Sequence, residues 1–148
     1  MTNRIKTFKW VLYRHTRDYD MIRKVAYMLK NDVSGSISTK DKDILIKKMQ
    51  TLGIYDPRNP SLPQDSINHR INTLAYFLYG YKSKVGSSNR FLFSPLGNLF
   101  LRNLSDDTKL AKIFLCMLWG IQFPHPSAGT DEDIFSLYPY RLILTLLK

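Results

Sequence analysis

The sequence predicts a mainly α-helical protein with one small β-hairpin, a winged helix-turn-helix domain followed by additional C-terminal helices. Apolar residues recur at helical spacing in several separate segments of the chain. One loop rich in Gly, Ser and Asn joins two β-prone runs. With 148 residues, of which 44% are hydrophobic, the chain can bury a single modest core.

Three helices are predicted before the hairpin. The first covers residues 18–29 and is followed by Gly35, a typical stop signal. The second begins at a cap provided by Ser38 or Thr39 and ends at Gly53. The third covers residues 66–79 and carries an apolar stripe that consists of Ile67, Ile71, Leu74, Ala75 and Leu78.

The hairpin and three further helices follow. Residues 79–85 and 90–93 are β-prone runs, and the loop at 86–89 between them is typical of a hairpin. Ser94 and Pro95 predict the start of a helix that runs to Arg102. Ser105 is the predicted cap of the next helix, up to residue 119, and residues 138–147 predict a last one.

The positive charge is concentrated in the first two thirds of the chain. The net charge is +10, and residues 1–104 contain 18 Lys and Arg against 7 acidic residues. Residues 1–17 and 66–105 contain no acidic residue at all. Such a density of like charge is tolerated when the partner is a polyanion, although a solvated basic face is the alternative explanation. The charge therefore favours a nucleic-acid partner, and together with the helix and hairpin described next we expect double-stranded DNA.

Two sets of residues are predicted to contact DNA. The third helix lies before a basic hairpin, as the recognition helix of a winged helix does, and its polar face carries amide, imidazole and guanidinium groups that suit base edges. An ordinary polar helix face is the alternative. The predicted base-reading residues are Asn68, His69, Arg70, Asn72 and Thr73. The predicted contacts to the DNA backbone are Lys6, Lys9, Trp10, Arg14, Lys82, Lys84 and Arg90.

These expectations define two parts of the chain. Residues 1–104 are assigned to a winged-helix DNA-recognition domain with an N-terminal arm. Residues 105–148 are assigned to a helical extension packed on the same core.

The sequence predicts no catalytic centre, no metal site and no cofactor in this chain. Glu132 is the only glutamate, and the acids of Asp107-Thr108-Lys109 suit the first turn of a helix. The three histidines are not spaced as a zinc site. A single cysteine, Cys116, excludes an internal disulfide and favours a reducing cytoplasm. The apolar run at 113–119 is too short to span a membrane, so we expect no membrane association.

Three short motifs, in the same order along the chain, resemble the N-terminal recognition region of FokI-like type IIS restriction endonucleases. Residues 5–11 (IKTFKWV) resemble the opening motif of that family. Residues 91–97 (FLFSPLG) are similar to its strand and following helix start, and residues 138–147 (YPYRLILTLL) to its next helix. Leu12 and Tyr13 stand where the family has amide side chains, so the recognised sequence is not carried over.

The resemblance implies a winged-helix-like subdomain that reads an asymmetric duplex site. It also implies that the parent is a bacterial type II site-specific deoxyribonuclease, with Mg²⁺ needed only in a separate cleavage domain. We expect the isolated domain to be a monomer. Two alternatives stay open. One is a winged-helix transcriptional regulator that dimerises through residues 113–119 and 138–147, and the other is a basic interaction module for RNA or an acidic protein.

Overall fold

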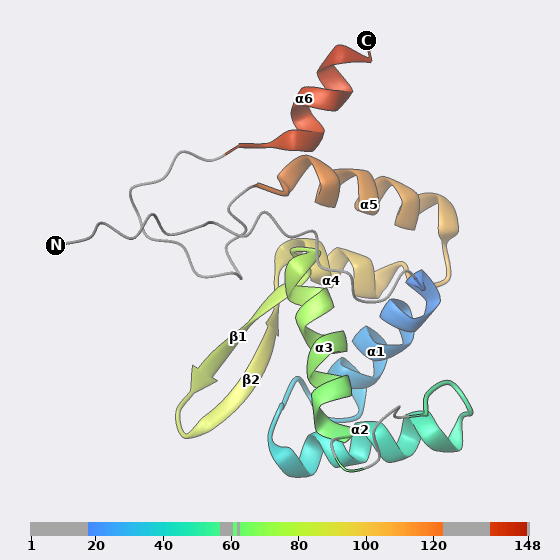
Figure 1. Ribbon diagram of the computed structural model, residues 1–148, viewed down its shortest axis with the longest axis vertical. Helices are drawn as coiled ribbons and strands as arrows, with labels where there is room; N and C mark the ends of the chain where they lie inside the picture. The colour runs from blue at the N-terminus through green and yellow to red at the C-terminus, as the bar shows by residue number, and fades with distance from the viewer. Residues whose placement is uncertain (1–17, 57–60, 62, 123–136, 148) are drawn as a thin grey trace, which may run out of the picture.

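The computed structural model describes residues 18–56, 61, 63–122 and 137–147. This part of the chain forms six helices and a two-stranded antiparallel hairpin (Figure 1). The predicted class is confirmed, and the order of the elements is compatible with a winged helix. The elements are α1 (Tyr19–Asn31), α2 (Thr39–Thr51), α3 (Pro63–Tyr76), β1 (Gly80–Val85), β2 (Ser88–Phe93), α4 (Pro95–Arg102), α5 (Asp107–Gly120) and α6 (Pro139–Leu146).

Four helices begin at a side chain that accepts a hydrogen bond from the first turn. Ser38 caps α2 and Ser94 caps α4, as the sequence predicts. Asp18 caps α1 in the same way. The predicted cap of α5 is wrong by one residue, because Asp106 rather than Ser105 accepts from the backbone N–H of Lys109. A carboxylate at this position also interacts favourably with the helix dipole.

Helix α3 begins and ends three residues earlier than the sequence predicts. It begins at Pro63, because a proline fits the first turn, where its missing N–H is not needed. It ends at Tyr76, because Leu78 adopts a left-handed conformation with φ of 59°. The backbone N–H of Tyr79 then donates to the carbonyl oxygen of Leu74 at 3.0 Å, which closes the helix end. The chain therefore turns sharply from α3 into β1.

The hairpin has a tighter turn than the predicted loop at 86–89. Val85 pairs with Ser88, which leaves only Gly86 and Ser87 in the turn. Gly86 has a φ of 61°, which a two-residue turn requires and glycine adopts without strain. A short segment between α1 and α2 pairs with the free edge of β2, where the N–H of Phe91 donates to Gly35 at 2.7 Å and the N–H of Ile37 donates to Asn89 at 3.0 Å.

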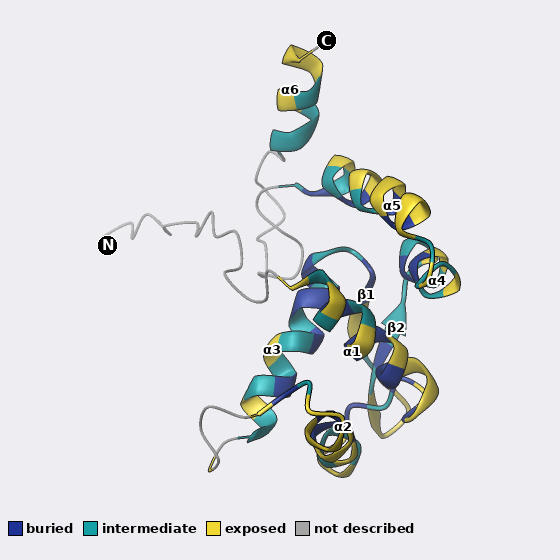
Figure 2. Ribbon diagram, turned by 90° about the vertical axis from the view of Figure 1, so that its right-hand side faces the viewer, coloured by how far each residue is buried: buried dark blue, intermediate teal, exposed yellow. Residues whose placement is uncertain are grey.

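The core lies where α1, α2, α3, the hairpin and α4 meet. Helices α1 and α2 both pack on α3, and Figure 2 shows buried residues on these elements. Tyr79 is fully buried and stacks on Phe100 of α4, with ring centroids 4.3 Å apart. Leu110, Ile113 and Met117 of α5 belong to the same cluster of buried residues. The first five helices and the hairpin thus share one core.

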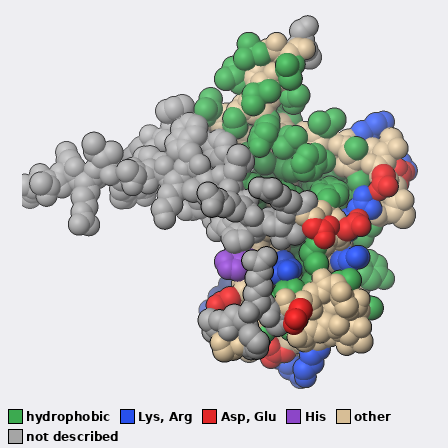
Figure 3. Space-filling view, turned by 45° about the vertical axis from the view of Figure 1, so that its right-hand side comes forward, with side chains coloured by type: hydrophobic (Ala, Val, Ile, Leu, Met, Phe, Trp, Pro, Cys, Tyr) green, Lys and Arg blue, Asp and Glu red, His purple; other side chains and the backbone are tan. Residues whose placement is uncertain are grey.

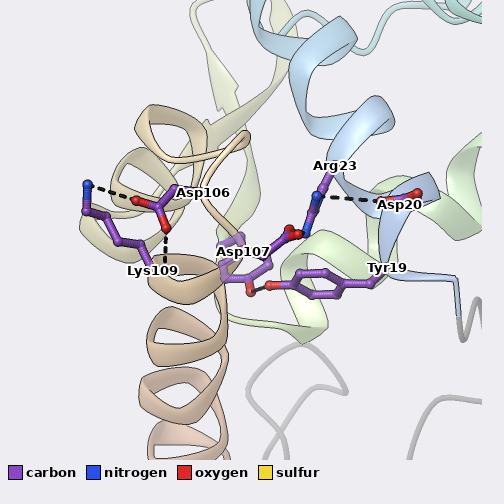
Figure 4. A network of polar contacts seen from close by, with 7 residues as sticks. Tyr19, Asp20, Arg23, Asp106, Asp107 and Lys109 are labelled. Carbon is purple, nitrogen blue, oxygen red and sulfur yellow. Dashed lines mark hydrogen bonds and ion pairs between the residues drawn. The ribbon is translucent and has the colours of Figure 1, made fainter.

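A polar network joins the start of α1 to α5 and to the core. The hydroxyl groups of Tyr19 and Tyr79 are hydrogen-bonded at 2.8 Å, and burial raises the pKa of both. Arg23 forms an ion pair with Asp107 at the start of α5 and lies 3.6 Å from Asp20 (Figure 4). The network therefore links α1 to the start of α5 and to Tyr79 in the turn before β1, three parts of the chain that are far apart in the sequence.

An apolar face is exposed on α5 and α6. Figure 3 shows hydrophobic side chains gathered over these helices. Helix α6 has no buried residue and is attached through Arg141, whose Nε donates to the carbonyl oxygen of Trp119 at 2.8 Å. None of the helices in the described ranges has the length and apolar character needed to cross a membrane. The exposed apolar residues of this face are Leu115, Trp119, Leu142, Ile143, Leu146 and Leu147.

Gly97 allows α4 to touch the turn between α3 and β1. A Cβ added at this position would clash with the carbonyl oxygen of Tyr79 and lie 2.7 Å from its carbonyl carbon. We expect Gly97→Ala to lower the free energy of unfolding by about 1–3 kcal/mol, the usual cost of overpacking. Urea denaturation measures this change. Leu99→Ala on the same helix, at a half-exposed position, is the control, and an equal loss in both variants would contradict the close contact.

Candidate nucleic-acid interface

A polar groove of about 540 Å³ separates α3 from the hairpin. Three lysines and three asparagines supply most of its polar groups, and no acidic residue lines it. The sequence predicted four of the six, Asn68, Asn72, Lys82 and Lys84, as DNA contacts. It did not predict Lys42 and Asn89. The lining consists of Ile37, Lys42, Asn68, Asn72, Lys82, Ser83, Lys84 and Asn89.

Simple periodicity places these side chains together. Asn68 and Asn72 are four residues apart on α3, so they share one face of the helix, and both are half-buried. Lys82 and Lys84 are two residues apart on β1, so they share one face of the hairpin. Asn89 pairs with Lys84 across the two strands. Lys42 comes from the first half of α2 and closes the groove from a third element.

The lysines of the groove repel one another. The pKa of Lys82 is lowered, first by partial burial of its ammonium group and then by the positive charge of Lys42. The groove therefore concentrates positive charge without an acidic residue in its lining to compensate. A bound anion would relieve this repulsion.

His69 and Thr73 occupy different environments on α3. His69 is exposed, as expected for a residue that contacts a partner. Thr73 is only 1% exposed, and its hydroxyl donates to the carbonyl oxygen of His69 at 3.0 Å. Thr73 and Tyr76 thus lie on the side of α3 that packs into the core, although the sequence places both on its polar face. This burial does not favour base reading by Thr73, which stays a prediction.

Arg70 packs against the loop that follows α2. Its guanidinium lies over the ring of Tyr55, 4.1 Å from the ring centroid. Its Nη1 also donates to the carbonyl oxygen of Ser66 at 3.1 Å. Arg70 is not part of the groove lining. Its contact with bases stays a prediction, and its visible role is to support α3.

Arg90 ties the hairpin to the loop after α1. Its Nη2 donates to the carbonyl oxygen of Ser34 at 2.5 Å, and its backbone forms a bridge with Ser36. A contact of Arg90 with the DNA backbone stays a prediction. The remaining predicted backbone contacts, Lys6, Lys9, Trp10 and Arg14, lie outside the described residues.

Asp41 fixes the start of α2 next to the hairpin. Its carboxylate accepts hydrogen bonds of 2.5 Å from the hydroxyl groups of Ser36 and Ser38. These bonds lower the pKa of Asp41. Ser36 belongs to the segment that pairs with β2, and Ser38 caps α2. Asp41 therefore holds α2, the helix that carries Lys42, in place relative to the hairpin.

Metal-binding groups are not gathered in this part of the protein. Within residues 18–56, 61, 63–122 and 137–147, no three His, Cys, Asp or Glu residues lie together in a way that could hold a metal ion. The lining of the groove has three ammonium groups, which repel a cation, and lacks the carboxylates that Mg²⁺ prefers as protein ligands. The site is suited to an anionic partner.

The chain belongs to a family of restriction-endonuclease domains, the N-terminal domain of HgaI and its relatives. The model of that family, described as the N-terminal domain of the type II restriction endonuclease HgaI, matches residues 4–148. The type II restriction enzyme HgaI of Avibacterium volantium is 45% identical over 140 residues. That alignment covers 93% of this chain and 28% of the relative, so the chain spans less than a third of the relative's length. No solved structure matches the chain.

The comparison confirms that the chain is related to restriction endonucleases. The closer likeness to the FokI kind, which the sequence motifs predicted, stays a prediction. The opening motif at residues 5–11 lies outside the described residues, and the second motif forms β2 and the start of α4.

The hydrogen bonds of Asp41 predict an acid-dependent stability. A carboxyl group whose pKa is lowered by folding stabilises the native state above its unfolded pKa, which is near 4, and loses this effect as the pH falls through the folded value. We expect Asp41→Asn to lower the free energy of unfolding at pH 7 by roughly 0.5–1 kcal/mol. The difference from the unmodified chain should shrink below about pH 4, and urea titrations across pH measure it. A difference that is constant from pH 7 to pH 2 would contradict this assignment.

The contact of Arg70 with Tyr55 predicts a structural effect. We expect Arg70→Ala to lower the free energy of unfolding by about 1 kcal/mol, the size of a partly desolvated cation–π contact. Tyr55→Ala should remove the same contact, so the double variant should lose less than the sum of the two. Additive losses would show that the two side chains are not coupled.

Proposed function

We propose that this chain recognises a specific sequence in double-stranded DNA, as the recognition domain of a type IIS restriction endonuclease. The observation that carries the proposal is the cationic groove beside the polar face of α3, in a chain of the HgaI family. In this proposal the cleavage chemistry and its Mg²⁺ belong to another part of the parent protein. The lining of the groove supports this division, since it contains no acidic residue.

The proposed mode of binding follows the order of the elements. A helix fits the major groove of B-DNA, where each base pair has a distinct pattern of donors and acceptors. We place α3 there, with Asn68, His69 and Asn72 facing the base edges. An asparagine amide can pair with adenine through one donor and one acceptor. The hairpin then lies along the phosphates, as a wing does.

The apolar face of α5 and α6 favours one alternative. A winged-helix transcriptional regulator would need a dimer interface, and this face lies in the two segments that the sequence suggested for it. A dimer binds half-sites related by its own symmetry, so its site is palindromic. A monomeric recognition domain reads an asymmetric site. The symmetry of the bound sequence therefore separates the two functions.

The function is tested by selection from random duplex DNA at about 150 mM salt. Nonspecific affinity is then weak, with a Kd of roughly 10⁻⁴–10⁻⁶ M. We expect a short asymmetric motif. A palindromic motif bound by a dimer in sedimentation would favour the regulator. If no motif is recovered, or if single-stranded RNA competes as well as duplex DNA, the proposed function is wrong.

Variants of α3 test how the motif is read. We expect Asn72→Ala to reduce the preference for the selected duplex over a duplex with one changed base pair by about 5- to 150-fold, equivalent to 1–3 kcal/mol, because a bidentate pair is lost. This preference should be lost at only one base-pair position of the motif. Gln50→Ala, at an exposed position of α2, is the matched control and should leave the preference unchanged. Equal effects of the two variants would exclude Asn72 from base reading.

A further inference from the structure

Lys42, Lys82 and Lys84 form a cluster of ammonium groups that we call the three-lysine groove. Two of these residues come from β1, and the third comes from α2. The question is which chemical group lies between them. The proposed function places α3 in the major groove and the hairpin along the phosphates, but it assigns no role to α2 and does not say what occupies the space that Lys42 closes.

The geometry points to one strand of the DNA backbone. In B-DNA each phosphodiester strand forms the ridge between a major and a minor groove. If α3 enters the major groove, an element that lies beside α3 across a cleft meets the next ridge. The hairpin lies beside α3 in this way (Figure 1). Residues of both elements line the three-lysine groove. A ridge of phosphates therefore fits between α3 and the hairpin.

We propose that the three-lysine groove holds the phosphodiester backbone of one DNA strand, and that Lys42 of α2 is its third cationic contact. This inference rests on the proposed function, since it assumes α3 in the major groove. It adds a residue that neither the sequence motifs nor the comparisons single out. It also assigns Lys42, Lys82 and Lys84 to affinity rather than to sequence preference.

The acidic residues on either side of Lys42 in the sequence lie outside the groove lining and are engaged elsewhere. Asp43, the next residue along α2, accepts a hydrogen bond of 2.9 Å from the side-chain amide of Gln64. Asp41 is engaged by the hydroxyl groups of Ser36 and Ser38. Neither lines the groove. The three ammonium groups are thus held together without an acidic residue in the lining, as expected of a site that completes its charge balance with a phosphate.

The other lysines of α2 are placed differently. Lys48 forms an ion pair of 2.6 Å with Asp32. Lys40 and Lys47 are exposed and do not line the groove. Lys40 and Lys47 therefore provide matched controls, because each carries the same charge on the same helix as Lys42 and lies outside the site.

The salt dependence of DNA binding tests the groove directly. Each phosphate that a protein neutralises contributes about 0.9 to the slope of log Kd against log salt concentration. We expect Lys42→Gln, Lys82→Gln and Lys84→Gln each to reduce this slope by about 0.9. Each should weaken the selected duplex and an unrelated duplex by the same factor. Lys42→Arg should restore the slope, and Lys40→Gln and Lys47→Gln should leave it unchanged.

The outcomes separate this inference from the proposed function. If a motif is selected but Lys42→Gln has the slope of Lys40→Gln, the groove assignment is overturned and the function stands. If no motif is selected but the three groove variants reduce the slope, the groove binds phosphates and sequence-specific recognition is overturned. If Lys42→Gln changes the preference between the two duplexes, Lys42 contacts a base and the assignment to the backbone is wrong. If no duplex binds at any salt concentration, both are overturned.

Discussion

The position of Tyr79 is the constraint on which the candidate site depends. This residue ends the turn between α3 and β1, stacks on Phe100 and shares a hydrogen bond with the hydroxyl of Tyr19. Its backbone carbonyl lies against Gly97 and accepts from the N–H of Ser94. Because the side chain and the backbone are both held, the hairpin leaves α3 in one direction. That direction creates the groove between them.

A second set of contacts fixes the opposite end of the groove. The segment at 35–37 pairs with β2, Arg90 bonds to the carbonyl oxygen of Ser34, and Asp41 joins Ser36 to the start of α2. Through these bonds the segment between α1 and α2 holds α2 and the hairpin together. Lys42 therefore lines the same groove as the lysines of β1, although 40 residues separate it from Lys82 in the sequence.

The sequence predicted the elements well and the site in part, for a physical reason. Periodicity determines which residues of one helix share a face, so it placed Asn68 with Asn72 and Lys82 with Lys84. It does not determine how wide the buried face of a helix is. Helix α3 packs against both α1 and α2, so its buried face is broad and includes Thr73 and Tyr76, whose polar groups suggested an exposed position. Lys42 and Asn89 had no signal of their own, because only the approach of α2 and the hairpin to α3 brings them together.

The distribution of the acidic residues explains how a protein with moderate net charge obtains a strongly basic groove. Asp18 and Asp106 cap helices, Asp107 pairs with Arg23, and Asp32 pairs with Lys48. Asp41 bonds to Ser36, in the segment that pairs with β2, and Asp43 bonds to Gln64 of α3. Both therefore hold α2 in place through hydrogen bonds. These carboxylates serve the stability of the fold and lie outside the groove lining. The carboxylates that hold the elements together thus lie outside the groove, and no acidic residue shares its lining with Lys42, Lys82 and Lys84. This arrangement favours the binding of a polyanion.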